Sequence, residues 1–220
     1  MSLPEAIGIG LGAAALLLTF VLEWLRLPRI QIKAERWGPA GKHDWTFAVV
    51  HVRNKPLPRW LPFTRASADG CRAMIEFRRG GDKDLYIREV PGRWSGTPQP
   101  VREEHVQPPE ELKSLLPEGA VLAVTKFDAQ LVPQTLTFDL PAASRWEEIA
   151  IAVLHRDGEA HAFGAESYAF GPLWKNPDWK LERGVYDVAV RLEASGVSKT
   201  KHFKLDNLAA DFARFKTAPA

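Results

Sequence analysis

The amino-terminal part of this chain carries a long uncharged run, AIGIGLGAAALLLTFVL, which extends from Ala6 to Leu22. An α-helix rises about 1.5 Å per residue, so the run would be roughly 26 Å long, close to the ~30 Å hydrocarbon core of a bilayer. A segment of this kind restricts the architecture before any other residue is considered. We predict that it forms a single transmembrane helix and that residues 1–28 form an N-terminal membrane anchor.

Two other interpretations of the run fit the sequence less well. A cleaved signal peptide has a basic region before its apolar core and a small-x-small cleavage site after it. No Lys or Arg precedes Ala6, and the run ends on Phe20, Val21 and Leu22, none of which is small. A buried helix of a soluble domain would carry a polar face, which the run lacks.

The flanks of the run predict an orientation. The N-terminal flank holds no basic residue, whereas Arg26, Arg29, Lys33 and Arg36 follow the run. Basic residues near the end of a membrane span stay on the cytoplasmic side. We therefore expect a single-pass protein of the cell membrane with its large C-terminal part in the cytoplasm.

Small residues recur along one face of the predicted helix. Gly8, Gly12 and Ala15 form a small-xxx-small pattern, which lets two helices approach closely. One interpretation is a homodimer that pairs through this face. The other is that glycine and alanine simply fill an apolar helix, and the sequence leaves both open.

Charge is distributed unevenly along the chain. The segment 26–79 has 12 basic and 4 acidic residues, and the segment 80–220 is mildly acidic, with 17 basic and 21 acidic residues. Basic residues beside the cytoplasmic leaflet are attracted to its anionic lipids. We expect the lipid bilayer to be a partner, the alternative being a solvated basic face. No recognition motif accompanies this dispersed charge, so nucleic acid binding is not predicted.

Short alternating runs between turn signals predict an all-β fold. In segment 71–78, Cys71, Ala73, Ile75 and Phe77 share one face, and Asp157-Gly158 is a strong hairpin signal. Eight or nine such strands favour an antiparallel β-sandwich over residues 29–205. Residues 206–220 are predicted to form a short C-terminal helix and a tail, because Leu208, Phe212 and Phe215 recur at helical spacing.

One segment resembles a known structural family. Leu181-Glu182-Arg183-Gly184-Val185-Tyr186 precedes the alternating Val188 and Val190. This segment is similar to the tyrosine corner of immunoglobulin-like Greek-key sandwiches. The resemblance implies a fold and no activity: in that motif the tyrosine hydroxyl donates a hydrogen bond to the backbone a few residues upstream. The paired cysteines of antibody domains are missing, since Cys71 is the single cysteine.

The sequence contains no recognised catalytic motif. There is no G-x-S-x-G elbow, no P-loop and no H-E-x-x-H pattern. His155 and His161 flank Asp157-Gly158, and a two-residue loop would place them on opposite faces of the sheet, where they could not share a metal ion. Cys71 is expected to be a small core residue. We therefore predict no catalytic residues, no cofactor and no metal site, and interpret the protein as a non-enzyme.

Eight tryptophans are unusual for this length, and several fall in predicted loops. The candidate contacts are Trp60 in PRWLPF, Trp94 in a long proline-rich loop, and Trp174 and Trp179 in LWKNPDW. Such side chains can anchor a protein partner, stack on a sugar or enter the headgroup region, or they can close the ends of a sandwich.

Together these patterns predict a membrane-anchored binding or assembly module with a protein partner of unknown identity. The rival hypothesis is an outward-facing carbohydrate-binding domain that uses Trp174 and Trp179. The fold class alone cannot choose between the two.

Overall fold

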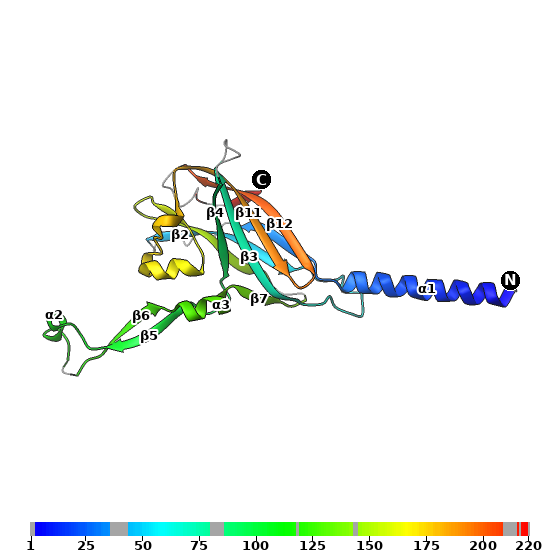
Figure 1. Ribbon diagram of the computed structural model, residues 1–220, viewed down its shortest axis with the longest axis horizontal. Helices are drawn as coiled ribbons and strands as arrows, with labels where there is room; N and C mark the ends of the chain where they lie inside the picture. Colours follow the sequence, from blue (N-terminus) through cyan, green and yellow to red (C-terminus); the bar gives the residue numbers. More distant parts are fainter. Residues whose placement is uncertain are drawn as a thin grey trace.

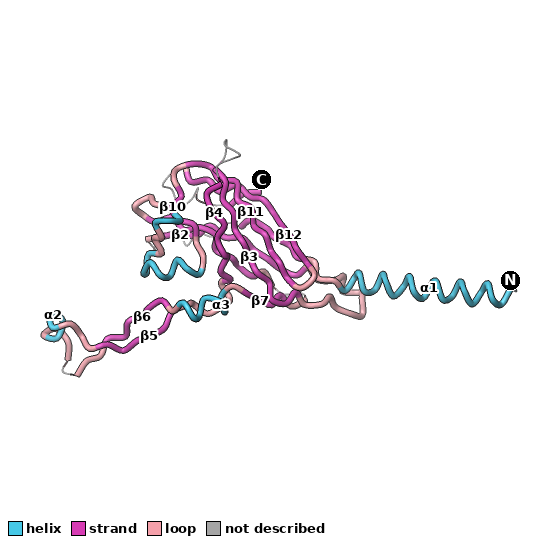
Figure 2. Tube along the Cα trace, viewed as in Figure 1, coloured by secondary structure: helices cyan, strands magenta, loops and turns pink. Residues whose placement is uncertain are grey.

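The computed structural model describes residues 3–35, 44–79, 86–117, 119–142, 145–208, 215 and 217–219, with the side chains of residues 3–10, 35, 86–88, 172 and 219 left out. Figure 1 shows three parts: a long N-terminal helix that projects from one end, a body of β-strands, and a slender two-stranded arm. The tube view in Figure 2 shows that most of the body is strand. The prediction of an all-β fold is confirmed.

Helix α1 spans Leu3–Arg26 and extends away from the body (Figure 1). Within the part of the chain that the structure describes, no helix is long and apolar enough to cross a membrane, so the predicted transmembrane span is not supported. Of the candidate helix-packing residues, Gly8 falls among those whose side chains lie outside the described part. Gly12 and Ala15 are exposed, and a Cβ added at Gly12 would meet no atom within 4 Å.

The body consists of antiparallel strands in one continuous order, β1-β2-β8-β4-β3-β11-β12-β13, which folds into two sheets. The first sheet contains β1 (Ile30–Glu35), β2 (Trp45–Asn54), β8 (Glu147–His155), β9 (Ala160–Ala162) and β10 (Lys180–Leu181). The second contains β3 (Ala68–Arg79), β7 (Thr137–Leu140), β11 (Gly184–Ala194), β12 (Val197–Asn207) and β13 (Thr217–Pro219). The two sheets enclose one hydrophobic core in a sandwich-like arrangement.

Strand β4 (Tyr86–Trp94) belongs to both sheets. Its residues up to Gly92 pair with β3, and Arg93 and Trp94 pair with β8. At the opposite edge the sheets are linked by side chains: Lys201 Nζ donates to the Ile32 carbonyl (2.9 Å) and Thr217 Oγ1 to the Val49 carbonyl (2.9 Å). The two sheets are therefore joined at one edge by β4 and at the other edge by side-chain hydrogen bonds.

The core lies between the two sheets and follows the alternation of the sequence. On β3 the predicted inward residues Cys71, Ala73, Ile75 and Phe77 are all buried. Burial, followed by the charges of two aspartates, raises the pKa of the Cys71 thiol to about 11. A thiol with so high a pKa is protonated at neutral pH, which agrees with a core residue and not with a nucleophile.

The tyrosine-corner hydrogen bond is present. Tyr186 is buried at the start of β11, and its hydroxyl donates to the carbonyl of Glu182 at 2.8 Å. Asn207 supports the same turn, because its Nδ2 donates to the carbonyls of Leu181 (3.1 Å) and Glu182 (2.9 Å). This segment behaves as the resemblance implied.

Two local predictions were wrong. The proline-rich segment around Trp94 is predicted to be a loop, but Pro91 to Trp94 complete β4. The proline is tolerated because β4 changes its partner strand directly afterwards. The C-terminal helix was expected to begin at residue 206 or 207, but β12 continues through Asn207 and β13 follows. Residues 209–214, on which that prediction also rested, lie outside the described part.

Strands β5 (Val101–Val106) and β6 (Leu122–Phe127) form the separate two-stranded arm, with helix α2 (Glu110–Lys113) near its tip (Figure 1). The short helices η1 (Ala129–Leu131) and α3 (Val132–Thr135) lead back to β7. Between β9 and β11, η2 (Ala165–Leu173) and η3 (Pro177–Trp179) lie over one face of the first sheet. The arm and these helices frame a cleft that is described below.

Candidate functional site

The four candidate tryptophans do not form one surface patch. Trp94 and Trp179 are buried in the main core, so they are packing residues. Trp94 Nε1 donates to the Cys71 carbonyl (3.2 Å), and its ring stacks on that of Phe138. Trp60 is 80% exposed beside the end of α1, whereas Trp174 is partly buried near the base of the arm. These last two belong to separate sites.

The junction between α1 and the sandwich is held by a buried arginine. Arg65 Nη1 donates to the carbonyls of Leu25 (2.6 Å) and Leu27 (3.1 Å), and Nε donates to the carbonyl of Lys55 (2.8 Å). The last carbonyls of a helix have no partner within the helix, and a positive charge there is favourable. Arg65 therefore fixes the end of α1 to the body.

Backbone groups reinforce this junction. The Ala66 amide donates to the Arg26 carbonyl (2.6 Å), and the Lys55 amide donates to the Arg29 carbonyl (2.8 Å). The buried Asn54 accepts from the Arg29 amide at 3.0 Å and donates to the Ala66 carbonyl at 2.8 Å. Residues 25–29 are thus held on both sides by the strand end and by the loop that follows it.

A groove of about 470 Å³ lies beside the junction. Its apolar lining comes from Leu25 and from the proline- and leucine-rich segment 56–61, and its polar lining comes from Arg29, Lys55 and Arg65. Among the described residues that line it there is no carboxylate. Burial, followed by the positive charge of Arg29, lowers the pKa of Arg65 from its ordinary value.

Aromatic side chains flank this groove. The guanidinium of Arg29 lies over the ring of Trp24, 4.2 Å from its centre, and that of Arg26 lies 5.6 Å from the centre of the Phe63 ring. A cation that lies over the face of an aromatic ring at this distance is attracted electrostatically to the ring. The end of α1 therefore carries a collar of two cations and two indole rings, which are Trp24, Arg29, Lys55 and Trp60.

A second hollow, of about 410 Å³, is an aromatic cleft between the base of the arm and η2. Its lining includes Trp45, Phe127, Tyr168 and Trp174, with Gln99 and Thr125 as polar members. Trp174 has a φ of +52°, a left-handed conformation that is rare for a bulky residue. Its ring packs edge-on against Trp45, with centroids 5.3 Å apart, and contacts Phe47 at 5.4 Å. The cleft is suited to a flat or apolar group that stacks on indole.

The structure corrects the prediction for the two histidines. The β8–β9 register pairs Val153 with His161, and the His155 amide bonds to the Glu159 carbonyl, so the loop has three residues and not two. The two imidazoles therefore share one face and lie in contact, with ring centroids 5.6 Å apart. Both are buried, and burial is the largest cause that lowers their pKa values, that of His161 to about 4.

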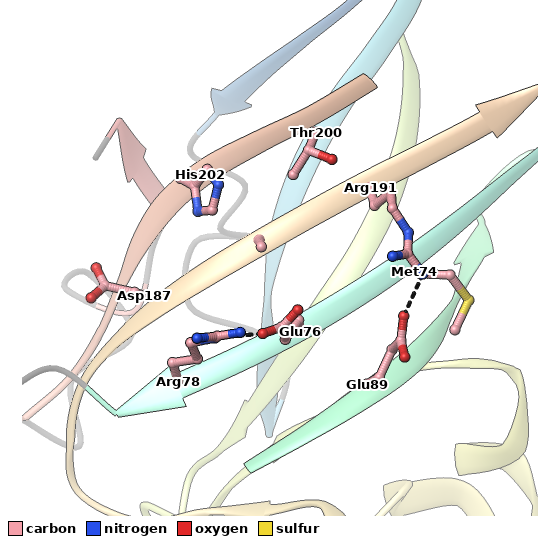
Figure 3. A pocket seen from close by; sticks show the side chains of 9 residues that line it. Met74, Glu76, Arg78, Glu89, Asp187, Arg191, Thr200 and His202 are labelled. Atoms are coloured by element: carbon pink, nitrogen blue, oxygen red, sulfur yellow. Dashed lines mark hydrogen bonds and ion pairs between the residues drawn. The ribbon is translucent and has the colours of Figure 1, made fainter. Parts of the chain in front are cut away.

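The outer face of the second sheet forms the third hollow, of about 560 Å³ (Figure 3). Figure 3 shows two ion pairs on this face: Arg191 of β11 contacts Glu89 of β4 across the intervening β3 (2.7 Å), and Arg78 contacts Glu76 on β3 itself (2.5 Å). Asp187 and His202 lie on the same face. Because these charges are exposed and mutually satisfied, this face is a solvated sheet surface with weak ion pairs.

The described residues offer no group of three or more His, Cys, Asp or Glu side chains that could hold a metal ion. The chain was compared with protein families, with curated proteins and with solved structures, and none of them matches it.

The most informative residue at the junction, Arg65, was missed by the sequence reasoning. A single arginine in a proline-rich segment has no pattern that distinguishes a buried helix clamp from a solvated cation. A usable signal was present in the composition of segment 55–65, where Lys55, Arg59 and Arg65 alternate with prolines, leucines and Trp60.

Proposed function

We propose that this protein is a non-enzymatic binding or assembly module that α1 anchors to a lipid bilayer. The observation that carries this proposal is the uncovered apolar surface of α1. The consecutive Leu16, Leu17 and Leu18 are 64, 66 and 60% exposed. Successive residues of an α-helix point about 100° apart, so no side of this turn is covered by the body.

A bilayer fits this surface better than a protein groove does. A helix that is apolar on all sides is surrounded by an apolar medium, whereas a helix that binds a groove needs only one apolar stripe. The helix ends at Trp24 and at a cluster of basic residues, which is the arrangement found where a membrane helix reaches the headgroups. Pairing of two copies through Gly8, Gly12 and Ala15 is compatible with insertion, because it would use one face only.

Protease accessibility tests the orientation. In sealed vesicles prepared from cells, we expect the body to be digested only when the protease reaches the cytoplasmic side, since Arg26 and Arg29 follow the apolar run. Digestion of the body from the outer side would contradict a cytoplasmic location. Crosslinking through cysteines placed at Gly12, in a Cys71→Ala background, tests the proposed homodimer, with a cysteine at Leu18 as the matched control.

The immunoglobulin-like classification of the sandwich is part of the same proposal. It is supported by the Tyr186–Glu182 hydrogen bond and by antiparallel pairing throughout the described strands. The family carries many binding functions, so the classification adds no ligand.

A carbohydrate-binding function is the second candidate, and one observation favours a revised form of it. Trp179 is buried and cannot stack on a sugar, but Trp174 and Trp45 line the aromatic cleft. A glycan array with the full-length protein in detergent tests this function. Binding that is lost in Trp174→Ala and retained in Trp60→Ala would favour it, and absence of binding by the unmodified protein would exclude the glycans on the array.

A further inference from the structure

We propose that the groove beside the α1 junction binds the headgroup of an anionic phospholipid. This inference rests on the proposed membrane anchoring, because the lipid would come from the bilayer that surrounds α1. It names a specific contact where the anchoring proposal names only the bilayer as a partner.

The position of the groove is the first reason. Leu25, in the last turn of α1, forms part of its lining, so the groove opens at the depth where the helix leaves the apolar phase. Trp24 and the 80% exposed Trp60 lie at the same end of the molecule. Indole rings favour the interface between hydrocarbon and headgroups, so both rings are suited to that depth.

The charge of the groove is the second reason. Arg29, Lys55 and Arg65 contribute positive charge, and the described lining contains no carboxylate that would favour a cationic choline group. Arg65 donates to three backbone carbonyls through Nε and Nη1, and its charge adds to the positive potential of the groove. Arg29 and Lys55 are exposed, and Arg59 is exposed next to Trp60 in the same loop. Lysine and arginine donors of this kind bind phosphate oxygens well.

The rigidity of the groove is the third reason. The carbonyl clamp of Arg65 and the Asn54 hydrogen bonds fix the walls relative to the helix end. Apolar side chains from segment 56–61 cover the remaining wall, which suits the glycerol and upper acyl carbons below a headgroup. A preorganised site loses less entropy when it binds, so a lipid would be selected and not only attracted.

Spin-labelled lipids test the proposal with the full-length protein. The protein is reconstituted into phosphatidylcholine vesicles that contain a trace of spin-labelled phosphatidylglycerol or spin-labelled phosphatidylcholine, and electron paramagnetic resonance measures the motionally restricted fraction of each. The variant to compare is the triple substitution Arg29→Gln, Lys55→Gln and Arg59→Gln. The matched control is Arg102→Gln, Lys113→Gln and Lys126→Gln, which removes the same charge from the arm, far from α1 (Figure 1).

We expect the unmodified protein and the arm control to restrict phosphatidylglycerol more than phosphatidylcholine. In the groove variant, the preference for phosphatidylglycerol over phosphatidylcholine should fall roughly tenfold. Equal preference in all three proteins would overturn the headgroup site while leaving the anchor intact. Failure of the unmodified protein to restrict either lipid would contradict the anchoring itself. The two failures are therefore distinguishable.

Discussion

At the scale of single residues, Arg65 connects the end of α1 to the body of the protein. It is a charged side chain buried at the end of a helix, and its Nε and Nη1 donate to the carbonyl oxygens of Leu25, Leu27 and Lys55. Burial of such a charge is costly unless it is hydrogen-bonded, and here several bonds compensate for the cost.

We predict that Arg65→Ala lowers the free energy of unfolding by about 2–4 kcal/mol, because three carbonyl bonds and the charge at the helix end are lost together. Chemical denaturation in detergent, followed by tryptophan fluorescence, measures the change. Arg59→Ala, an exposed cation of the same loop, should change the free energy by less than about 0.5 kcal/mol. Equal effects of the two substitutions would show that Arg65 is not a clamp.

Tyr186 gives a second prediction at this scale. Tyr186→Phe keeps the ring in the core but removes the donor to the Glu182 carbonyl, so the free energy of unfolding should fall by about 1–2 kcal/mol. Tyr168→Phe, which removes a hydroxyl at the aromatic cleft, is the control for loss of a phenol. An unchanged stability of Tyr186→Phe would remove the support for a tyrosine corner.

The buried histidine pair predicts a pH dependence. Burial, then the charge of His155, lowers the pKa of His161 from 6.5 to about 4, and Lys175 and Lys180 act in the same direction while Glu159 opposes them. The unfolded chain therefore binds protons more readily than the folded one, and protonation favours unfolding. Stability should be complete above about pH 6.5 and should fall by up to about 3 kcal/mol as the pH drops toward 4.

Equilibrium unfolding at a series of pH values measures this loss. In His161→Phe the slope between pH 6.5 and pH 4 should be reduced, whereas His202→Gln, at an exposed histidine, should keep it. The carboxylates near the pair do not account for this window, because the pKa of Glu159 is lowered to about 2 by hydrogen bonds to Lys180 and Lys175. A slope that is the same in all three proteins would contradict the assignment.

At the scale of elements, the strands could be predicted from the sequence more accurately than the loops that connect them. The inward face of β3 followed from alternation alone, and the place of Tyr186 near the start of β11 followed from the resemblance to a tyrosine corner. The Asp157-Gly158 hairpin was also predicted, but not its length, because Gly158 at a φ of +84° fits a three-residue loop with one residue in the left-handed region as well as a two-residue turn. The one-residue difference in loop length decides whether His155 and His161 lie on the same face of the sheet.

The candidate site was harder to predict than the fold. The groove and the aromatic cleft each combine segments that are distant in sequence, such as Leu25 with Arg65 and Trp45 with Phe127. The spacing of residues within one helix or strand does not indicate contacts between segments that are distant in sequence. The position of Trp94 was missed for a related reason: a proline normally excludes a sheet interior, but β4 crosses between sheets where the proline is accommodated.

A glycine shows how closely two of these elements approach. A Cβ at Gly164, just before η2, would lie 2.5 Å from the Pro91 carbonyl oxygen and 2.9 Å from a methyl group of Val90. Gly164→Ala should therefore lower the free energy of unfolding by about 1–3 kcal/mol, because backbone must move. Gly12→Ala, which meets no atom within 4 Å, is the control and should not destabilise. Thermal unfolding of both variants measures the difference.

At the scale of the whole molecule, three parts have separate surfaces. Helix α1 presents apolar side chains, and the collar beside it presents cations and indole rings. The arm lies at the opposite end of the molecule from α1 (Figure 1), and the aromatic cleft lies at the base of the arm. A protein held at a bilayer by α1 would direct the cleft and the arm away from the lipid. This arrangement suits a module that meets its partner at a distance from the membrane surface.

Flotation of the full-length protein with lipid vesicles, followed by an alkaline wash, tests whether α1 holds the protein in a membrane. We expect the unmodified protein to remain with the vesicles, because Leu16, Leu17 and Leu18 are uncovered and bury in lipid. The triple substitution Leu16→Gln, Leu17→Gln and Leu18→Gln should release it. Recovery of the intact unmodified protein in the aqueous fraction without detergent would contradict membrane anchoring and the headgroup site that depends on it.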